Sequence, residues 1–297
     1  MCIKKVGVFH NITTEYSPWS CAEGIAATLN QQGYKVFDFK NPRHTPPTVD
    51  ILEAMDVIIL SGPEHFFDAI LNYYGEAWLK LSTIKVAWYT ETSKRDDRVF
   101  DFGSYRNLAD YHYFPAIQDA VEFDGIWLPF GVDTNIFRPI SLKKKHQFAF
   151  IGSMYPKRQE YIKHLGSKVE ILSPAIGSDQ VTSLVALIKA YNEIDIFVNL
   201  PAYSRLLVTK ITEVMACQTM IITPRLDDES AAQNMTQFDD GVHLVYYDAQ
   251  NPRELCKILD YYATRPDARD AIAMAGWQEV TRNHTLSSRI KYIMENI

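Results

Sequence analysis

The amino-acid sequence predicts an α/β protein with two Rossmann-like domains, each built on a parallel sheet. Short β-branched and aromatic runs of strand length alternate with amphipathic stretches of helical period along most of the chain. This rhythm breaks at residues 129–146, where two prolines, a glycine and four Lys or Arg residues come together, and then restarts. Alternating strands and helices favour parallel sheets that are covered by helices on both faces.

Composition limits the function classes. The chain has 297 residues, of which 47% are hydrophobic and 22% charged, as in a globular protein long enough for two cores. A net charge of -6 and a pI near 5.8 argue against a general nucleic-acid binder. No apolar run approaches the roughly 20 residues of a spanning helix, so we expect no stable membrane span. The four cysteines are far apart, which is typical of reduced thiols in a cytoplasmic protein.

The first half, residues 1–139, is expected to form the N-terminal domain. Gly33 closes an alanine-rich helical stretch, and Ser61-Gly62-Pro63 bounds a short buried strand. In residues 64–80, aromatic and aliphatic side chains recur on one side with a helical period. The expected strands are 4–9, 35–39, 56–60, 84–89 and 125–128, and the expected helices are 19–32, 49–55 and 64–80.

Residues 140–282 are expected to form the second domain, and residues 283–297 a C-terminal helix that packs back on the first. Pro156 near the start of its helix and the β-branched run 220–223 are typical of such a unit. The expected strands are 147–151, 169–172, 196–198, 220–223 and 243–246. The expected helices are 156–165, 182–191, 208–217, 251–263, 266–282 and one from 286.

Two groups of residues indicate a ligand site in the second half. Lys210 and Glu213 lie one helical turn apart at the start of a helix that follows a strand, where ligands gather in parallel sheets. Gly152-Ser153 likewise joins a strand to a helix, so that backbone N–H groups can approach phosphate, and Lys157 and Arg158 add cations there. The simpler interpretation is that both pairs are ordinary surface residues.

The stretch from Lys210 to Cys217, KITEVMAC, resembles the K-x-x-E-x-x-A-x-G motif of nucleotide-sugar glycosyltransferases with the GT-B fold. Four more pieces resemble the CgeB-like (spore maturation) branch in the family's order: 128–139, 148–165, 239–247 and 283–293. The resemblance implies two Rossmann-like domains that face a central cleft, an acceptor domain first and a donor domain second. It also implies that Glu213 holds the ribose of the donor, that Gly152, Ser153, Lys157 and Arg158 hold its diphosphate, and that Lys210 contacts additional phosphate or sugar oxygens.

One position departs from the family pattern. Retaining members carry a Glu eight positions before the second Glu, and here that position holds Arg205. Arg205 is therefore a candidate for the donor phosphate or a sugar hydroxyl, and the choice between a retaining and an inverting enzyme stays open. Among N-terminal residues, Glu91 and His10 are the candidates for the catalytic base, because each follows an expected strand. Glu15 and His112 are weaker candidates.

The implied reaction moves a sugar from a nucleotide-diphosphate donor to a hydroxyl acceptor, without a metal or other cofactor. The acidic pairs, among them Asp239-Asp240, have no His or Cys at ligand spacing, and we interpret them as caps and turns. The acceptor is open: a glycan, a lipid-linked sugar, a small molecule or a modified nucleobase in DNA. Only the lysines at 143–145 favour DNA, and a solvated linker explains them more simply. A nucleotide-sugar epimerase and a non-enzymatic binding module are the remaining alternatives.

Overall fold

The chain folds into two compact units, each with one parallel sheet. The structure, a computed structural model, describes residues 5–10, 21–40, 46–91, 100–173, 183–201, 206–226 and 233–297. Unit 1 consists of Met1–Gly131 and Leu286–Ile297, and unit 2 of Val132–Thr285. The α/β class with two Rossmann-like sheets, predicted from the alternating pattern, is confirmed.

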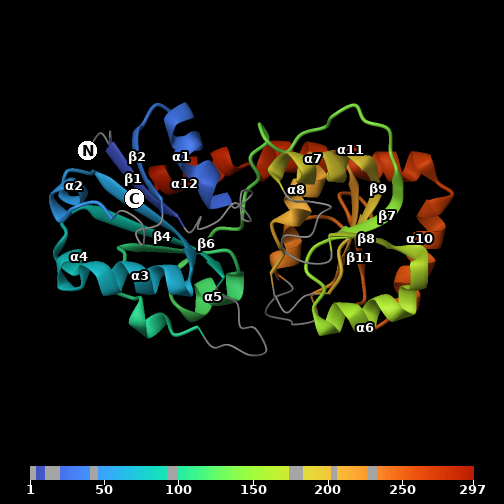
Figure 1. Cartoon of the computed structure of the whole chain (residues 1–297), viewed down its shortest axis with the longest axis horizontal. Helices are drawn as coiled ribbons and strands as arrows, with labels where there is room; N and C mark the ends of the chain where they lie inside the picture. The colour runs from blue at the N-terminus through green and yellow to red at the C-terminus, as the bar shows by residue number, and fades with distance from the viewer. Residues whose placement is uncertain are drawn as a thin grey trace. The chain divides into compact units, whose positions relative to one another are not determined.

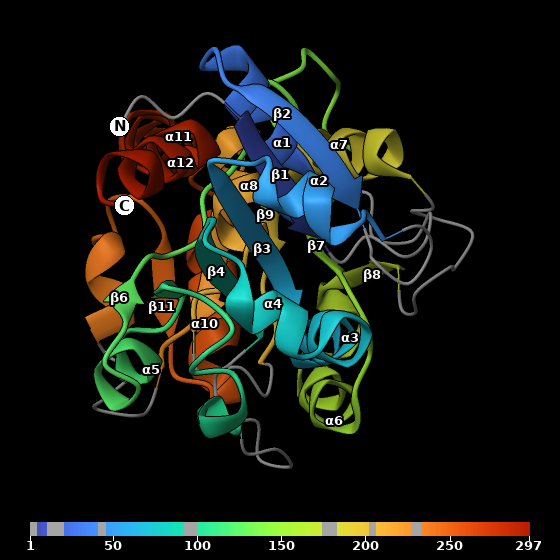
Figure 2. The same cartoon turned by 90° about the vertical axis from the view of Figure 1, so that its left-hand side faces the viewer.

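Unit 1 holds a six-stranded sheet in the order β2-β1-β3-β4-β5-β6. Helices α1 and α12 cover one face of this sheet, and α3 and α4 cover the other (Figures 1 and 2). Its elements are β1 (Lys5–His10), α1 (Cys21–Gln31), β2 (Lys35–Lys40), α2 (Val49–Glu53), β3 (Val57–Pro63), α3 (Glu64–Tyr74), α4 (Glu76–Lys80), β4 (Ile84–Glu91), η1 (Phe102–Ser104), β5 (Tyr111–Phe114), α5 (Ile117–Glu122), β6 (Ile126–Trp127) and α12 (Leu286–Glu295).

Unit 2 holds a five-stranded sheet in the order β11-β10-β9-β7-β8. Helices α6 and α10 lie on one face, and α7, α8 and α11 lie on the other (Figure 1). Its elements are β7 (His146–Ile151), α6 (Pro156–Leu165), η2 (Gly166–Lys168), β8 (Glu170–Ser173), α7 (Leu184–Glu193), β9 (Ile194–Val198), α8 (Lys210–Ala216), β10 (Met220–Pro224), η3 (Gln233–Gln237), β11 (Val245–Tyr247), α10 (Pro252–Ala263) and α11 (Pro266–Asn283).

In each sheet the strand order reverses at one point, and these points locate possible ligand sites. In unit 2, β7 lies between β8 and β9, and in unit 1, β1 lies between β2 and β3. Ligands of open parallel sheets bind beyond the carboxyl ends of the strands at such a reversal. The loops that follow β7 and β1 are therefore the expected ligand sites.

The division between the units falls after Gly131, earlier than the expected boundary after Pro139. The intervening residues bond to unit 2, because the Asn192 side chain accepts a hydrogen bond from the backbone N–H of Ile140 and donates to the carbonyl of Arg138. At the other end of the chain, α12 packs on α1, and the Arg289 guanidinium donates to the Pro129 carbonyl at 2.9 Å.

Two sequence-based expectations in unit 1 are wrong in detail. Residues 64–80 form two helices and not one, because Gly75 between them has a φ of 54°, a left-handed conformation that interrupts a helix. The strand β5 and the helix α5 were not expected, since the short run Tyr111–Phe114 mixes a histidine with aromatic residues and shows no clear period. The aromatic core of this unit, with Phe9, Phe67 and Tyr89 fully buried, accounts for the apolar pattern.

Within the described ranges, no helix is long and apolar enough to cross a membrane. Cys217 and Cys256 are free thiols. Burial raises the pKa of Cys217 to about 12, so this thiol stays protonated and behaves as a packing residue.

Candidate functional site

The loop that follows β7 approaches α8 so closely that only glycine fits. Gly152 has a φ of 148°. A β-carbon at this position would lie 2.8 Å from Lys210 Nζ and 2.9 Å from Cζ of Phe150. The sequence motif Gly152-Ser153 and the start of α8 therefore meet in space, at the point where the strand order of unit 2 reverses.

Arg158 is held inside this loop, although it belongs to the first helical turns of α6. Its side chain is buried. Nε donates to the carbonyl of Pro201 at 3.0 Å, and Nη1 donates to the carbonyl of Ser153 at 2.7 Å. The guanidinium also lies over the rings of Phe150 and Tyr155, at 4.9 and 5.0 Å from their centroids. Burial lowers the pKa of Arg158, but a guanidinium remains charged in proteins.

Lys210 supplies a second cation next to the loop. Its Nζ donates to the carbonyl of Ile151 at 2.8 Å and lies 4.8 Å from the centroid of the Phe150 ring. Burial, and next the nearby charge of Arg158, lower the pKa of Lys210 to about 7. Near neutral pH this side chain therefore changes its charge readily in response to a ligand.

Glu213 is the acidic member of the group. It is buried, and its Oε2 accepts a hydrogen bond from the Tyr191 hydroxyl at 3.1 Å. Burial raises the pKa of Glu213 to about 7, while the Tyr191 bond and Lys210 act in the opposite direction. The interpretation of Lys210 and Glu213 as a surface ion pair is wrong, because Glu213 is buried and the half-buried Lys210 bonds to the Ile151 carbonyl instead. Tyr191 was missed from sequence, since its place on the apolar face of α7 is typical of any core aromatic residue.

The structure brings together most of the donor-site candidates and separates one of them. Gly152, Ser153, Arg158 and Lys210 surround the β7 loop, with Glu213 one turn along α8. Lys157, the neighbour of Arg158, is instead exposed to solvent. Three candidates lie outside the described residues: Glu15, Arg205 and the side chain of Glu91.

His10 and His112 belong to unit 1. His10 ends β1 and is buried, with its Nε2 at 2.9 Å from Oδ1 of Asp38. His112 has partners on both ring nitrogens, the Tyr89 hydroxyl at 2.9 Å and the Arg106 carbonyl at 3.1 Å. Burial lowers the pKa of His112. It is therefore a satisfied structural residue.

The lysine run at 143–145 is exposed to solvent, as the linker interpretation predicts, and two of its lysines also bond to unit 2. Lys144 Nζ donates to the Ile194 carbonyl at 2.7 Å, and burial lowers its pKa. Lys145 forms an ion pair with Glu193 at 2.6 Å. Two of the three lysines thus attach the segment before β7 to unit 2.

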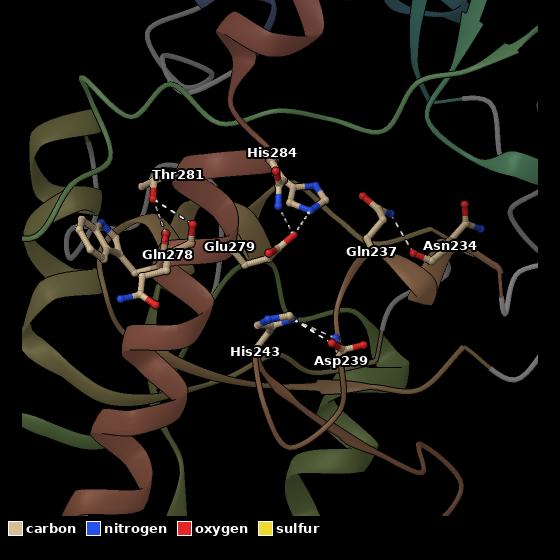
Figure 3. Close-up of polar contacts among 10 residues, drawn as sticks. Asn234, Gln237, Asp239, His243, Gln278, Glu279, Thr281 and His284 are labelled. Carbon is tan, nitrogen blue, oxygen red and sulfur yellow. Dashed lines mark hydrogen bonds and ion pairs between the residues drawn. The ribbon is translucent and has the colours of Figure 1, made fainter.

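The acidic turn after η3 makes internal contacts. Asp240 Oδ2 pairs with Arg225 at 3.0 Å, and its Oδ1 accepts from the backbone of Tyr246. Asp239 and His243 lie together, and His284 Nε2 lies 3.2 Å from Oε1 of Glu279 (Figure 3). In the part of the chain that the structure describes, no three His, Cys, Asp or Glu side chains group as metal ligands do.

His284 is where the chain leaves unit 2, and its contacts are structural. Its carbonyl accepts the backbone N–H of Val132 at 3.0 Å, so the incoming and outgoing segments of unit 2 are bonded to each other. Its ring packs against Phe238 at 4.7 Å between centroids.

Comparison with known proteins gives a family and a fold. The family model described as "Glycosyl transferase-like" matches residues 134–295, more than half of the chain. No curated protein matches the chain by sequence.

Among solved structures, sucrose-phosphate synthase from Thermosynechococcus elongatus is similar, with a TM-score of 0.68, 10% identity and 98% of each chain covered. So is Anabaena Alr3699/HepE in complex with UDP-glucose, with a TM-score of 0.68, 14% identity and 98% of each chain covered. An alpha-glucosyltransferase in complex with UDP-glucose and DNA containing an abasic site has a TM-score of 0.69 at 10% identity, again with 98% of each chain covered.

Proposed function

This chain belongs to the glycosyl transferase-like family and is a glycosyltransferase with the GT-B fold, and from that premise we propose that unit 2 binds a nucleoside-diphosphate sugar whose sugar is transferred to a hydroxyl acceptor. The observation that carries the proposal is the group of one buried cation, Arg158, one half-buried cation, Lys210, and one buried carboxylate, Glu213, around a glycine loop. Buried charges destabilise a fold unless they are paired. A charged ligand that pairs with these side chains explains why they are retained here.

The diphosphate is assigned to the loop between β7 and α6. The absence of a β-carbon at Gly152 opens the backbone to close approach by phosphate oxygens. Arg158 and Lys210 bond to the carbonyls of Ser153 and Ile151, which flank Gly152, and both are partly stripped of water by burial. Lys157 and Ser153 extend the site toward solvent, and Arg205 is a further candidate whose position lies outside the described residues.

The nucleoside ribose is assigned to Glu213. Its carboxylate lies one helical turn after Lys210 on α8, and Tyr191 holds one oxygen in place. A carboxylate accepts hydrogen bonds at both oxygens, so it can receive two neighbouring ribose hydroxyls. Such bonds are the stronger for being formed away from water.

The chemistry requires charge stabilisation at the leaving group. As the bond between the anomeric carbon and the diphosphate breaks, negative charge grows on the phosphate oxygens. Arg158 and Lys210 are placed to stabilise this charge without reorganisation, and the diphosphate in turn raises the pKa of Lys210 and keeps it protonated. The proposal therefore requires no cofactor. His10 and Glu91 remain the proposed candidates for the group that takes the proton of the acceptor hydroxyl.

UDP-glucose is the donor to test first, because similar folds have been solved with it. The free thiols Cys217 and Cys256 support a cytoplasmic setting for the proposed reaction. The full chain is heated with UDP-, GDP-, ADP- and dTDP-glucose in turn. A donor at 100 times its dissociation constant adds about 2.7 kcal/mol to the free energy of unfolding.

The same samples separate the alternatives. Transfer to an added hydroxyl compound, or slow hydrolysis of the donor, is expected of a glycosyltransferase, whereas an isomerised sugar with no acceptor present would indicate an epimerase. A third measurement compares two variants. Arg158→Ala removes a proposed donor cation, and Lys168→Ala is its matched control, because Lys168 is a cation of the same unit that pairs with Asp260 at 2.6 Å. If none of the four donors stabilises the chain, the proposed donor site is refuted.

A further inference from the structure

One aromatic ring lies against both cations of the β7 loop. The Arg158 guanidinium lies 4.9 Å, and the Lys210 ammonium 4.8 Å, from the centroid of the Phe150 ring. Phe150 belongs to β7, and its side chain is 0% exposed. Its Cζ lies 2.9 Å from the place that a β-carbon on Gly152 would take, so the ring also packs against the loop. Two cations from two different helices, α6 and α8, therefore meet on one side chain.

The two cations do not have the usual partner of a buried cation. Among the residues that the structure describes, neither has a carboxylate oxygen at ion-pair distance. Their hydrogen bonds go to backbone carbonyls instead, those of Arg158 to Ser153 and Pro201 and that of Lys210 to Ile151. The two like charges also repel each other, which contributes to the lowered pKa of Lys210. The carbonyls offset part of this cost, and the ring is the further group in contact with both charges.

An aromatic ring is suited to this task in a phosphate site. The face of the ring is the negative end of its quadrupole and attracts cations, most strongly where water is excluded, as it is around Phe150. A carboxylate in the same place would neutralise the cations and repel a diphosphate. The ring has no net charge, so it holds both cations and leaves their charge for a ligand.

Both cations also keep N–H groups for a ligand. A guanidinium has five N–H groups and an ammonium has three. Within the described ranges, the carbonyls take two of those of Arg158 and one of those of Lys210. Lys210 is half-buried, and the loop from Gly152 to Lys157 passes from half-buried to exposed. The ring is therefore enclosed, while the loop beside the cations is open to solvent.

We propose that Phe150 is a positioning residue of the donor site, whose ring holds the Arg158 guanidinium and the Lys210 ammonium at the β7 loop before the donor arrives. The inference rests on the proposed function, because it explains how the two proposed diphosphate ligands are kept in place. Without the ring, Lys210 turns to water or loses its proton, and the donor has to reverse this change on binding. Cations that are already in place need no reorganisation when charge develops on the leaving diphosphate.

Fluorinated phenylalanines at position 150 of the full chain test the role of the ring face. Mono-, di- and trifluorinated rings withdraw π-electron density stepwise, while the side chain keeps nearly the same size and stays apolar. The trifluorinated ring should weaken UDP-glucose binding about tenfold, a factor expected of a desolvated cation–π contact, with the other two rings in between. The kcat should fall in the same order. Calorimetric titration and steady-state kinetics measure the two effects.

Phe148 is the matched control. It lies two residues earlier on β7, on the same face of the sheet, and is also buried, but no cation lies over its ring among the described residues. Fluorinated rings at position 148 should leave UDP-glucose affinity and kcat unchanged. Phe150→Leu and Phe148→Leu should both lower the unfolding temperature, because each removes core volume. Only Phe150→Leu should also weaken donor binding.

A second readout does not depend on the donor. The charged groups that face Lys210 among the described residues are Arg158 of α6 and Glu213 of α8, and fluorination of Phe150 leaves both unchanged. Contact with a ring face favours the charged form of a lysine. The fluorinated rings should therefore lower the pKa of Lys210 further from its value of about 7 in the free protein. NMR titration of ¹³C-labelled lysine, assigned with Lys210→Met, measures this pKa.

The outcomes separate the inference from the proposed function. If neither donor affinity nor the pKa of Lys210 depends on fluorination at position 150, or if position 148 responds equally, the inference is overturned. Donor binding that is equally tight with every ring would refute the role of Phe150 and leave the proposed function standing. A fall in the pKa of Lys210 without binding of any nucleotide sugar to the wild-type chain would refute the proposed function and still support Phe150 as the residue that holds the cations.

Discussion

Lys210 occupies the space that a β-carbon on Gly152 would require: its Nζ lies 2.8 Å from the position of such a carbon. Residue 152 therefore has to be a glycine for the Lys210 side chain to reach the β7 loop. The ammonium group is bonded to the Ile151 carbonyl there, and burial keeps the pKa of Lys210 at about 7. This relationship gives the first two predictions.

Gly152→Ala should abolish or strongly weaken donor binding at a modest cost in stability. The new methyl group would push Lys210 and the Phe150 ring away, and a φ of 148° adds backbone strain of about 1–3 kcal/mol. Gly166→Ala is the matched control, because Gly166 also has a positive φ, 59°, but no atom lies within 4 Å of its β-carbon position. Calorimetric titration with UDP-glucose should show normal binding for Gly166→Ala only. Equal loss of donor binding in both variants would mean that backbone strain, and not the close approach of Lys210 to Gly152, determines donor binding.

Donor affinity should fall as the pH rises above about 7. The diphosphate favours charged Lys210, so binding takes up a proton wherever Lys210 of the free protein is partly deprotonated, and the Lys210 contribution to affinity is fully present only below its free pKa of about 7. Glu213, whose pKa is also raised to about 7, has the opposite sign, since its carboxylate form binds the ribose. The fall should therefore steepen in Glu213→Gln and disappear in Lys210→Met. UDP-glucose is the ligand for this titration, because its phosphates do not titrate near neutrality.

Arg158→Ala should lower kcat about 100-fold or more, as for other groups that stabilise transition-state charge. Arg158→Ala also removes the two hydrogen bonds to the Ser153 and Pro201 carbonyls. Arg158→Lys should restore little activity, because an ammonium group lacks the planar guanidinium geometry that makes both hydrogen bonds. Lys157→Ala changes an exposed neighbour, and its effect should stay within about 0.5 kcal/mol in stability. Steady-state kinetics of the three variants test the effects on kcat, and thermal unfolding tests the stability of Lys157→Ala. A larger loss for Lys157→Ala would place the diphosphate on the solvent side of α6.

Turnover should persist in EDTA. The argument rests on the cations that the site supplies, since Arg158 and Lys210 together offset the charge of a leaving diphosphate when Lys210 is protonated. The measurement is donor consumption with and without chelator, followed by addition of Mg²⁺ or Mn²⁺. A loss that either metal restores would contradict the expectation and direct attention back to the acidic pairs.

The sequence predicts the fold well, and the fold class and glycosyltransferase family expected from its motifs are confirmed. Periodicity locates β7, α6 and α8, because strand and helix periods are local properties of the chain. Whether a side chain is buried, in contrast, is not a local property of the chain. The spacing of Lys210 and Glu213 predicts a shared helical turn but equally suits a surface pair, and only tertiary neighbours such as Tyr191 decide between the two. For the same reason adjacent Lys157 and Arg158 have opposite environments.

The side chains of His10, Ser61 and Tyr113, which are buried on one face of the sheet of unit 1, are a further case. His10 is a sequence candidate because it follows a strand, but Ser61 and Tyr113 have no local signal. Their relation to His10 arises from the strand register across β1, β3, β4 and β5, which connects residues far apart in the chain.

Glu213→Ala and the gentler Glu213→Gln should raise the donor KM about tenfold or more, as expected for the loss of charge-assisted hydrogen bonds to two hydroxyls. The ribose does not change during transfer, so this binding is uniform between ground and transition states, and kcat should stay comparatively intact. Glu193→Gln is the matched control, because Glu193 is also a buried carboxylate of unit 2 but pairs with Lys145.

Tyr191→Phe tests the support of this carboxylate separately. The Tyr191 bond holds the pKa of Glu213 down, so its removal should raise that pKa further and weaken donor binding mainly at and below pH 7, with recovery at higher pH. Calorimetry at several pH values measures the effect. If wild type and Glu213→Gln bind UDP-glucose equally well at every pH, while both remain folded, Glu213 does not hold the ribose, and the assignment of α8 to the nucleoside is wrong.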